Sequence, residues 1–309
     1  MIIKKRNKPL VLQILESLNV RTILSSSEQK YYFNQLKGYE GEVQFDTYLE
    51  KLSFDCLVLN DLRLKESGNM VQIDSLILTN DVIYLYEVKN YSGNYDYKDD
   101  ALHSHSDFVI TNPLTQIYRS QPFIHNLVRK LGETMMIKSQ IIFINPDFYL
   151  YDLPRDKSFL FVNQLAREFD SLEKKHSAIK ESDKRLARQL SQLHIADYRP
   201  LDLPKYNYAS LKKGVICPLC FSFEHIDTRK NRICSCCGYK ETIVEAIKRS
   251  AENFHLLFPE VPITKHLIYE WCDKIYDEQR IQRVLRHHYS AHGSYKSTYY
   301  EVNSPELIK

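Results

Sequence analysis

The sequence has 309 residues, a length that suggests two or three domains rather than one. Hydrophobic residues make up 43% of it and charged residues 26%, which is typical of a globular protein and excludes a disordered chain. The formal net charge of +3 is too small to indicate nucleic-acid binding by itself. Any basic surface therefore has to be local.

Hydrophobic runs in the sequence are short. None approaches the roughly 18–20 residues that a membrane-spanning helix needs, and the runs at 82–86 and 141–144 have the length of buried strands. The first six residues, MIIKKR, are not followed by the hydrophobic segment and small-residue cleavage site of a signal peptide. We expect a cytoplasmic protein without a membrane partner.

Residues 1–36 predict an N-terminal helical extension. Leucine and isoleucine side chains between residues 10 and 18 form the stripe of one helix. Ser26 and Gln29 have the spacing of a capping box, which predicts the start of a second helix. We expect a further helix to begin at residues 38–42 (GYEGE).

The next segment, residues 37–163, has the pattern of a mixed α+β domain. Branched and aromatic residues separated by turn signals predict a three-stranded meander over 57–64, 71–78 and 82–89. Asn112-Pro113 then precedes a helix to about Leu131, followed by strands at 140–145 and 159–162. The expected order is helix, three strands, helix, strand.

Three more segments complete the predicted α/β and helical organisation. Residues 164–211 read as a charged helical connector that ends near two prolines, and residues 212–240 hold a cysteine-rich module. Residues 241–309 form a helical tail.

Charged residues interrupt two of the predicted buried strands. Alternation along residues 82–89 places Glu87 and Lys89 on the same face, and Asp74 lies on the preceding strand, one hairpin away. Two buried carboxylates repel each other unless a cation neutralises them. The alternative to a functional site is structural: Asp74 would form a salt bridge near a turn, and Glu87 and Lys89 would form a surface ion pair on an edge strand.

A divalent cation would explain this pattern. Carboxylate oxygens of Asp74 and Glu87 suit Mg²⁺ or Mn²⁺, which polarises a phosphate and lowers the pKa of a bound water. Lys89 would orient that water, and Glu42, on the predicted helix, would complete the metal shell directly or through water. Phosphodiester cleavage uses this set of groups.

Four short motifs resemble those of the NERD family, the nuclease-related domain of many bacterial proteins: GYEGE at 38–42, QID at 72–74, EVKNYSG at 87–93 and NPLTQ at 112–116. The resemblance covers about residues 37–150. It implies a restriction-endonuclease-like core of the PD-(D/E)xK nuclease superfamily, with Glu42, Asp74, Glu87, Lys89 and Gln116 in the site. For Gln116, a hydrogen bond at the start of its helix is the alternative to a contact with water, lysine or phosphate.

Five of the seven cysteines fall between residues 217 and 237. Clustered cysteines are metal ligands more often than disulfide partners in a reducing compartment. Two C-x₂-C pairs, Cys217 with Cys220 and Cys234 with Cys237, predict one structural Zn²⁺ in a zinc ribbon. Cys236 could replace Cys234 or Cys237, although the spacing leaves it spare. Arg229, Lys230 and Arg232, between the pairs, favour nucleic acid modestly over a protein partner.

The helical tail has a basic segment. Residues 263–273 and 278–289 read as two helices joined by a turn, and residues 294–302 as a strand or hairpin. This pattern is typical of a winged helix-turn-helix whose second helix would enter the major groove of DNA. Its DNA-binding candidates are Arg280, Arg283, Arg286 and Lys296. The alternative is a small helical domain with a solvated basic face.

Together these patterns predict a magnesium-dependent nuclease that hydrolyses DNA, targeted by the ribbon and the tail. Two other functions remain open: a non-catalytic DNA-binding or regulatory protein that retains a nuclease fold, and a protein-interaction module.

Overall fold

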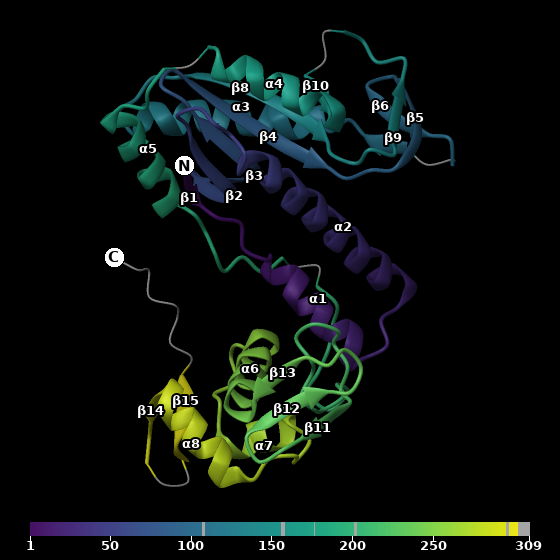
Figure 1. Ribbon diagram of the computed structural model, residues 1–309, viewed down its shortest axis with the longest axis vertical. Coiled ribbons are helices and arrows are strands. Elements are labelled where there is room, and N and C mark those ends of the chain that lie inside the picture. Colours follow the sequence, from purple (N-terminus) through teal and green to yellow (C-terminus); the bar gives the residue numbers. More distant parts are fainter. Residues whose placement is uncertain (107–108, 156–157, 176, 201–202, 295–296, 302–309) are drawn as a thin grey trace. The chain divides into compact units, whose positions relative to one another are not determined.

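The computed structural model describes residues 1–106, 109–155, 158–175, 177–200, 203–294 and 297–301 (Figure 1). The chain divides into two compact units. The first unit consists of residues 1–10 and 33–200, and the second of residues 11–32 and 201–309. Among the described residues, no helix has the length and hydrophobicity needed to cross a bilayer.

The first unit is built on a six-stranded sheet in the order β1-β2-β3-β4-β8-β10. The predicted meander is present as the antiparallel strands β2 (Leu57–Glu66), β3 (Asn69–Leu78) and β4 (Val82–Lys89). On one side β1 (Ile2–Lys4) pairs with β2 in parallel. On the other, β8 (Met136–Phe143) is parallel to β4, and β10 (Phe159–Phe161) is parallel to β8.

Helices cover both faces of this sheet, so β4 is buried on both sides. Tyr84 and Tyr86 pack in one core with α2 (Ser26–Leu49) and α4 (Leu165–Glu173). Ile83 and Leu85 pack in another with α3 (Leu114–Lys130) and α5 (Glu181–Gln192). Figure 1 shows α3 and α4 beside the sheet. A 3₁₀ turn, Val162–Gln164, precedes α4. The mixed α+β class is confirmed.

A second, four-stranded sheet follows β4 after three residues. Its order is β7-β6-β5-β9, with β5 (Gly93–Lys98), β6 (Ala101–Ser104), β7 (Val109–Thr111) and β9 (Phe148–Tyr151). Its inner face packs on the large sheet through a hydrophobic cluster that includes Phe143 and Phe148. The sequence did not predict this sheet, because β5 to β7 are short and lie in a mostly polar segment that reads as a loop.

The N-terminal region differs from the predicted helical extension. Residues 2–4 form a strand of the large sheet, and only then does α1 (Leu10–Arg21) begin. The two helices expected from Ser26 and from residues 38–42 are one continuous helix, α2, which runs across the predicted boundary at 36/37. Helices α4 and α5, expected to be a connector, pack on the sheet.

The second unit combines a small sheet with helices. An antiparallel sheet comprises β11 (His225–Asp227), β12 (Asn231–Cys234) and β13 (Lys240–Thr242). It is followed by α6 (Ile243–Leu257), α7 (Lys265–Trp271) and α8 (Glu278–His288). A hairpin of β14 (Ser290–His292) and β15 (Tyr299–Glu301) comes last.

Arg21, at the end of α1, organises the core of this unit. Its guanidinium donates to the backbone carbonyls of Lys212 and Gly214 at 2.7 and 3.1 Å and lies 4.0 Å from the ring centroid of the buried Trp271. Burial lowers the pKa of Arg21 to about 9.

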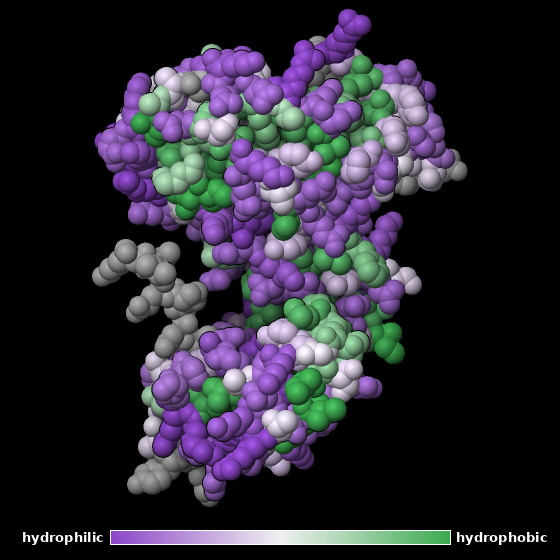
Figure 2. Space-filling model, viewed as in Figure 1, coloured by the Kyte–Doolittle hydropathy of each residue, from purple (hydrophilic) through white to green (hydrophobic). Residues whose placement is uncertain are grey.

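Figure 2 shows one face of the molecule coloured by hydropathy. On that face, hydrophobic residues lie in separate patches among hydrophilic residues.

Gly41 allows α2 to approach the end of β4, and this contact can be tested. A Cβ at position 41 would lie 2.5 Å from the Cβ of Asn90, whereas a Cβ at Gly38, on the same helix, would meet nothing within 4 Å. We expect Gly41→Ala to destabilise the protein by about 1–3 kcal/mol through overpacking. Gly38→Ala should be neutral or stabilise the helix by up to about 1 kcal/mol. Urea unfolding of both variants measures this; equal midpoints would contradict the close contact.

Candidate metal and nucleic-acid sites

Asp74 and Glu87 lie where the β3–β4 ladder ends. The paired stretch of the two strands stops at Ser75 and Tyr86, so each carboxylate occupies the next position along its strand. Asp74 Oδ2 accepts a hydrogen bond of 2.7 Å from the backbone N–H of Val88, and this bond holds the Asp74 carboxylate against β4. The hairpin thus brings together the two acids that the sequence predicted.

Lys89 joins β4 to α3 at this point. Its Nζ donates to Glu87 Oε1 at 2.8 Å and to Gln116 Oε1 at 2.5 Å. Gln116 therefore contacts Lys89, which is one of the contacts considered for Gln116 from the sequence. The side chain of Asn112 makes the helix-start hydrogen bond instead, accepting from the N–H of Leu114 at 3.0 Å.

Glu42 reaches the same region from α2. Its carboxylate is held by Arg6, a residue that the sequence analysis did not single out. Arg6 Nη1 donates to Glu42 Oε2 at 2.5 Å, and the Arg6 guanidinium also pairs with Asp46 at 2.9 and 3.0 Å. The Arg6 side chain is only 2% exposed. Its sequence neighbours, a run of basic residues near the N-terminus, gave no signal of burial.

Asp61 is a second missed residue. It sits at a break in the β2–β3 ladder, between the pairs of Asn60 and Leu62, with a left-handed φ of 52°. The register is the same on both sides of this break, so Asp61 lies opposite Asp74. A left-handed backbone at a residue other than glycine carries local strain, which is common near functional sites. Lys4 Nζ lies 3.9 Å from the Asp61 carboxylate and donates to its backbone carbonyl at 2.8 Å.

The carboxylates repel one another in this buried setting. Burial, followed by the negative charge of Asp74, raises the pKa of Glu87 to about 7. The same two causes raise the pKa of Glu42 well above its usual range, although Arg6 opposes them. Burial opposes the charge on Lys89, but Glu87 and Asp74 more than offset it and raise the pKa of that lysine.

We call this group of mostly buried charged side chains the carboxylate cluster. It contains five acids and three bases, so with every acid ionised it would carry two more negative than positive charges: Glu42, Asp46, Asp61, Asp74 and Glu87 against Lys4, Arg6 and Lys89. One divalent cation would neutralise that excess. The acids are not gathered into a closed cage, since within the described part of the chain only the cysteines put three or more ligand atoms within 4.8 Å of one another. Mg²⁺ suits an open arrangement because it retains several waters.

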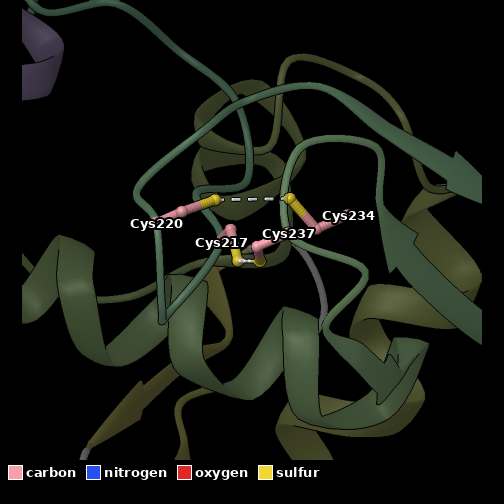
Figure 3. Close-up of side chains that lie close together, drawn as sticks. All are labelled: Cys217, Cys220, Cys234 and Cys237. Carbon is pink, nitrogen blue, oxygen red and sulfur yellow. Dashed lines mark hydrogen bonds between the residues drawn. The ribbon is translucent and has the colours of Figure 1, made fainter.

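Four cysteines of the second unit converge on one point (Figure 3). The Sγ atoms of Cys217 and Cys237 are 3.6 Å apart, those of Cys220 and Cys234 are 3.4 Å apart, and all four lie within 4.8 Å of one another. A disulfide requires about 2.05 Å, whereas tetrahedral thiolates around Zn²⁺ are about 3.8 Å apart for a Zn–S distance of about 2.3 Å. The four residues can therefore hold a metal ion.

Each cysteine pair forms a tight turn of the same kind. The residue after the second cysteine has a left-handed backbone in both, Phe221 with φ 59° and Gly238 with φ 74°. The N–H of Phe221 donates to the carbonyl of Cys217, and that of Gly238 to the carbonyl of Cys234, at 3.1 and 3.0 Å. Cys236 is exposed and is not one of the four converging residues.

The basic candidates of the tail have different surroundings. Arg283 and Arg286 are exposed on α8, while Arg280 is half-buried and donates to the backbone carbonyl of Arg229 at 3.0 Å. Lys296 lies outside the described residues.

The expectation that Arg232 favours nucleic acid is wrong. Arg232 is 4% exposed and donates to the hydroxyl of Tyr276 at 2.5 Å, so it belongs to the core of the second unit. Arg229 and Lys230 are exposed.

Comparison with known proteins gives one family match. Residues 37–144 match the family model of NERD, the nuclease-related domain. Those residues are therefore similar to a nuclease-related domain, and they include Glu42, Asp74, Glu87, Lys89 and Gln116. No curated protein matches the chain.

One solved structure is similar over part of the chain. It is the crystal structure of protein VC1899 from Vibrio cholerae, with 9% sequence identity and a TM-score of 0.26. The alignment covers 53% of this chain and 37% of that one, so the chain spans well under half the length of this relative.

The cysteine geometry predicts a metal content that can be measured. We expect the purified protein to hold one metal ion in the second unit, and each of Cys217→Ser, Cys220→Ser, Cys234→Ser and Cys237→Ser to lose most of it. Cys236→Ser, the matched control on the same loop, should keep it. Elemental analysis by mass spectrometry gives the content directly, and metal loss in Cys236→Ser would show that the ligand set is different.

Proposed function

We propose that the protein is a metal-dependent nuclease that hydrolyses DNA phosphodiester bonds. The observation that carries this proposal is the convergence of Asp74, Glu87, Lys89 and Gln116 at the end of the β3–β4 ladder, inside a cluster in which acids outnumber bases. The nuclease-related domain supports the same reading. The strand and helix order of the first unit is also compatible with a restriction-endonuclease-like core of the PD-(D/E)xK type.

The roles of the residues follow from their positions. Asp74 and Glu87 would hold one Mg²⁺ or Mn²⁺, with Glu42 completing its shell directly or through water. When bound, that ion would polarise the phosphate and supply an acidic water. Lys89, fixed by Glu87 and Gln116, would orient the attacking water and stabilise the charge that develops on the phosphate. Gln116 would restrain the Lys89 ammonium, so that it points into the site.

For the second unit we propose a zinc ribbon with a structural Zn²⁺. Cys217, Cys220, Cys234 and Cys237 would fill all four positions of a tetrahedral ion and leave none for substrate. The three-stranded sheet of β11, β12 and β13, with two cysteine turns beside it, supports this assignment. Metal binding would replace a large hydrophobic core in this small module.

We further propose that the tail of the second unit binds DNA as a winged helix-turn-helix. Helices α7 and α8 with the β14–β15 hairpin have the element order of that motif, and α8 exposes Arg283 and Arg286. Arg280 would contribute less, because it is bonded to the ribbon at Arg229. Lys296 remains a candidate on the basis of the sequence.

Cleavage assays with Mg²⁺ test the nuclease proposal. We expect the wild type to cleave at least one of single-stranded, double-stranded and branched DNA, and Lys89→Ala to lose about 100-fold or more, as removal of a charge-stabilising group typically does. Lys130→Ala is the matched control, because Lys130 is an exposed lysine paired with Glu66. Equal activity of wild type and Lys89→Ala would contradict the assignment. Cleavage of RNA alone would mean that the substrate is RNA and not DNA. Binding of DNA without cleavage would favour a regulatory DNA-binding protein.

DNA binding by the tail is tested separately, in EDTA-free buffer containing Ca²⁺ in place of Mg²⁺ to suppress cleavage. The double variant Arg283→Ala/Arg286→Ala should bind DNA more weakly, with the slope of log affinity against log salt reduced by about 2. The control Arg185→Ala/Arg188→Ala removes two exposed arginines from α5. Unchanged slopes in the first variant would leave the second unit as a protein-interaction module.

A further inference from the structure

Arg6 connects two elements that carry proposed metal ligands. Its guanidinium donates to the Glu42 carboxylate on α2 at 2.5 Å, and its Nη2 donates to the backbone carbonyl of Asp74 on β3 at 2.8 Å. Nη2 also reaches Ser75 Oγ at 3.2 Å. One buried side chain thus fixes the carboxylate of one ligand and the backbone of another.

Asp46 anchors the other edge of the same guanidinium. Both of its oxygens accept from Arg6, at 2.9 and 3.0 Å, in the two-pronged geometry that arginine and carboxylate favour. Asp46 lies one helical turn after Glu42 on α2. Arg6 is therefore held by one carboxylate while it holds another, which leaves its position tightly defined.

The N-terminal strand delivers Arg6 to this position. Strand β1 pairs with β2 in parallel, with Ile2 opposite Val58. The terminal amine of Met1 donates to the carbonyl of Cys56 at 2.6 Å, and Lys4 Nζ donates to the carbonyls of Asn60 and Asp61 at 2.8 Å each. These contacts fix the chain along the edge of the sheet up to the residue that enters the carboxylate cluster.

We propose that Arg6 is a positioning residue of the metal site, which orients Glu42 and the Asp74 backbone so that the cluster accepts one divalent cation. This rests on the proposed function of the cluster. Arg6 does not touch substrate, because its side chain is 2% exposed. It acts through Glu42 and Asp74, and one oxygen of Glu42, Oε1, is not the atom that Arg6 bonds.

Arg6 lies outside the segment that matches the nuclease-related domain. The match to the nuclease-related domain begins at residue 37, so the matched segment contains Glu42 and Asp74 but not the arginine that orients them. The site of this protein is completed by a segment from outside the matched domain. A lysine at position 6 would keep the charge but present a single ammonium in place of a planar fork with several donors.

Mn²⁺ binding to the full-length protein, with the cysteine site first filled with Zn²⁺, tests the role of Arg6. Electron paramagnetic resonance titration gives the affinity without requiring cleavage. We expect Arg6→Gln to weaken Mn²⁺ binding by about tenfold or more, the loss typical for residues that orient metal ligands. Arg6→Lys should be intermediate. Arg185→Gln, which breaks an arginine–glutamate pair on the surface between Arg185 and Glu133, should bind like the wild type.

The outcomes separate this inference from the proposed function. If Arg6→Gln folds and binds Mn²⁺ as tightly as the wild type, the proposed role of Arg6 is wrong. If Arg6→Gln does not fold, wild-type Mn²⁺ affinity in both Arg6→Lys and Asp46→Asn leads to the same conclusion. Asp46→Asn releases the anchor of Arg6 without changing Glu42, and we expect it to weaken Mn²⁺ binding by a smaller factor than Arg6→Gln. A lower melting temperature with unchanged Mn²⁺ affinity would make Arg6 a structural ion-pair residue only. Absence of Mn²⁺ binding in the wild type would overturn the proposed metal site itself.

Discussion

The burial of five carboxylates between α2 and the end of the β3–β4 ladder is the constraint on which the first unit depends. Three basic side chains offset part of their repulsion, and burial together with the remaining repulsion raises the pKa values of Glu42 and Glu87. A protein gains no stability from uncompensated buried charge, since desolvation is costly for each ion. The arrangement becomes understandable if a divalent cation completes it. The same carboxylates then change from a destabilising group into the ligands and supports of a reactive centre.

The surrounding architecture serves to hold these groups in place. The β3–β4 hairpin sets Asp74 beside Glu87, α3 brings Gln116 to Lys89, and Gly41 lets α2 approach closely enough for Glu42 to face the sheet. Strand β1 adds Arg6 from the start of the chain. The proposed ligands and the residues that support them thus come from separate elements, which pack in two hydrophobic cores. The four cysteines of the second unit could hold a metal ion of their own.

Sequence patterns predicted the parts of this site that depend on local periodicity. Two-residue alternation placed Glu87 and Lys89 on one face, and the paired C-x₂-C spacing selected the four cysteines that converge. The helices expected at 263–273 and 278–289 are present as α7 and α8. These features could be predicted because each is encoded within a few residues. The catalytic, magnesium-binding and DNA-binding roles remain proposals.

Long-range features were not predictable in the same way. Arg6 reaches Asp74 across 68 positions in the sequence, and its burial depends on the parallel pairing of β1 with β2. Asp61 enters the cluster where the β2–β3 pairing is interrupted and its backbone turns left-handed, which the alternation of side chains along a strand does not predict. Arg232 looked like part of a basic surface but is buried against Tyr276. In each case tertiary packing decides the role of a charged residue.

The function proposed for the first unit requires that the carboxylate cluster bind one divalent cation. Anomalous diffraction from crystals grown with Mn²⁺ tests it most directly, because the scattering locates the ion without assuming any activity. We expect one Mn²⁺ peak within about 2.5 Å of carboxylate oxygens of both Asp74 and Glu87, distinct from any ion held by the four cysteines. A well-ordered cluster without a Mn²⁺ peak, at saturating Mn²⁺, would contradict it.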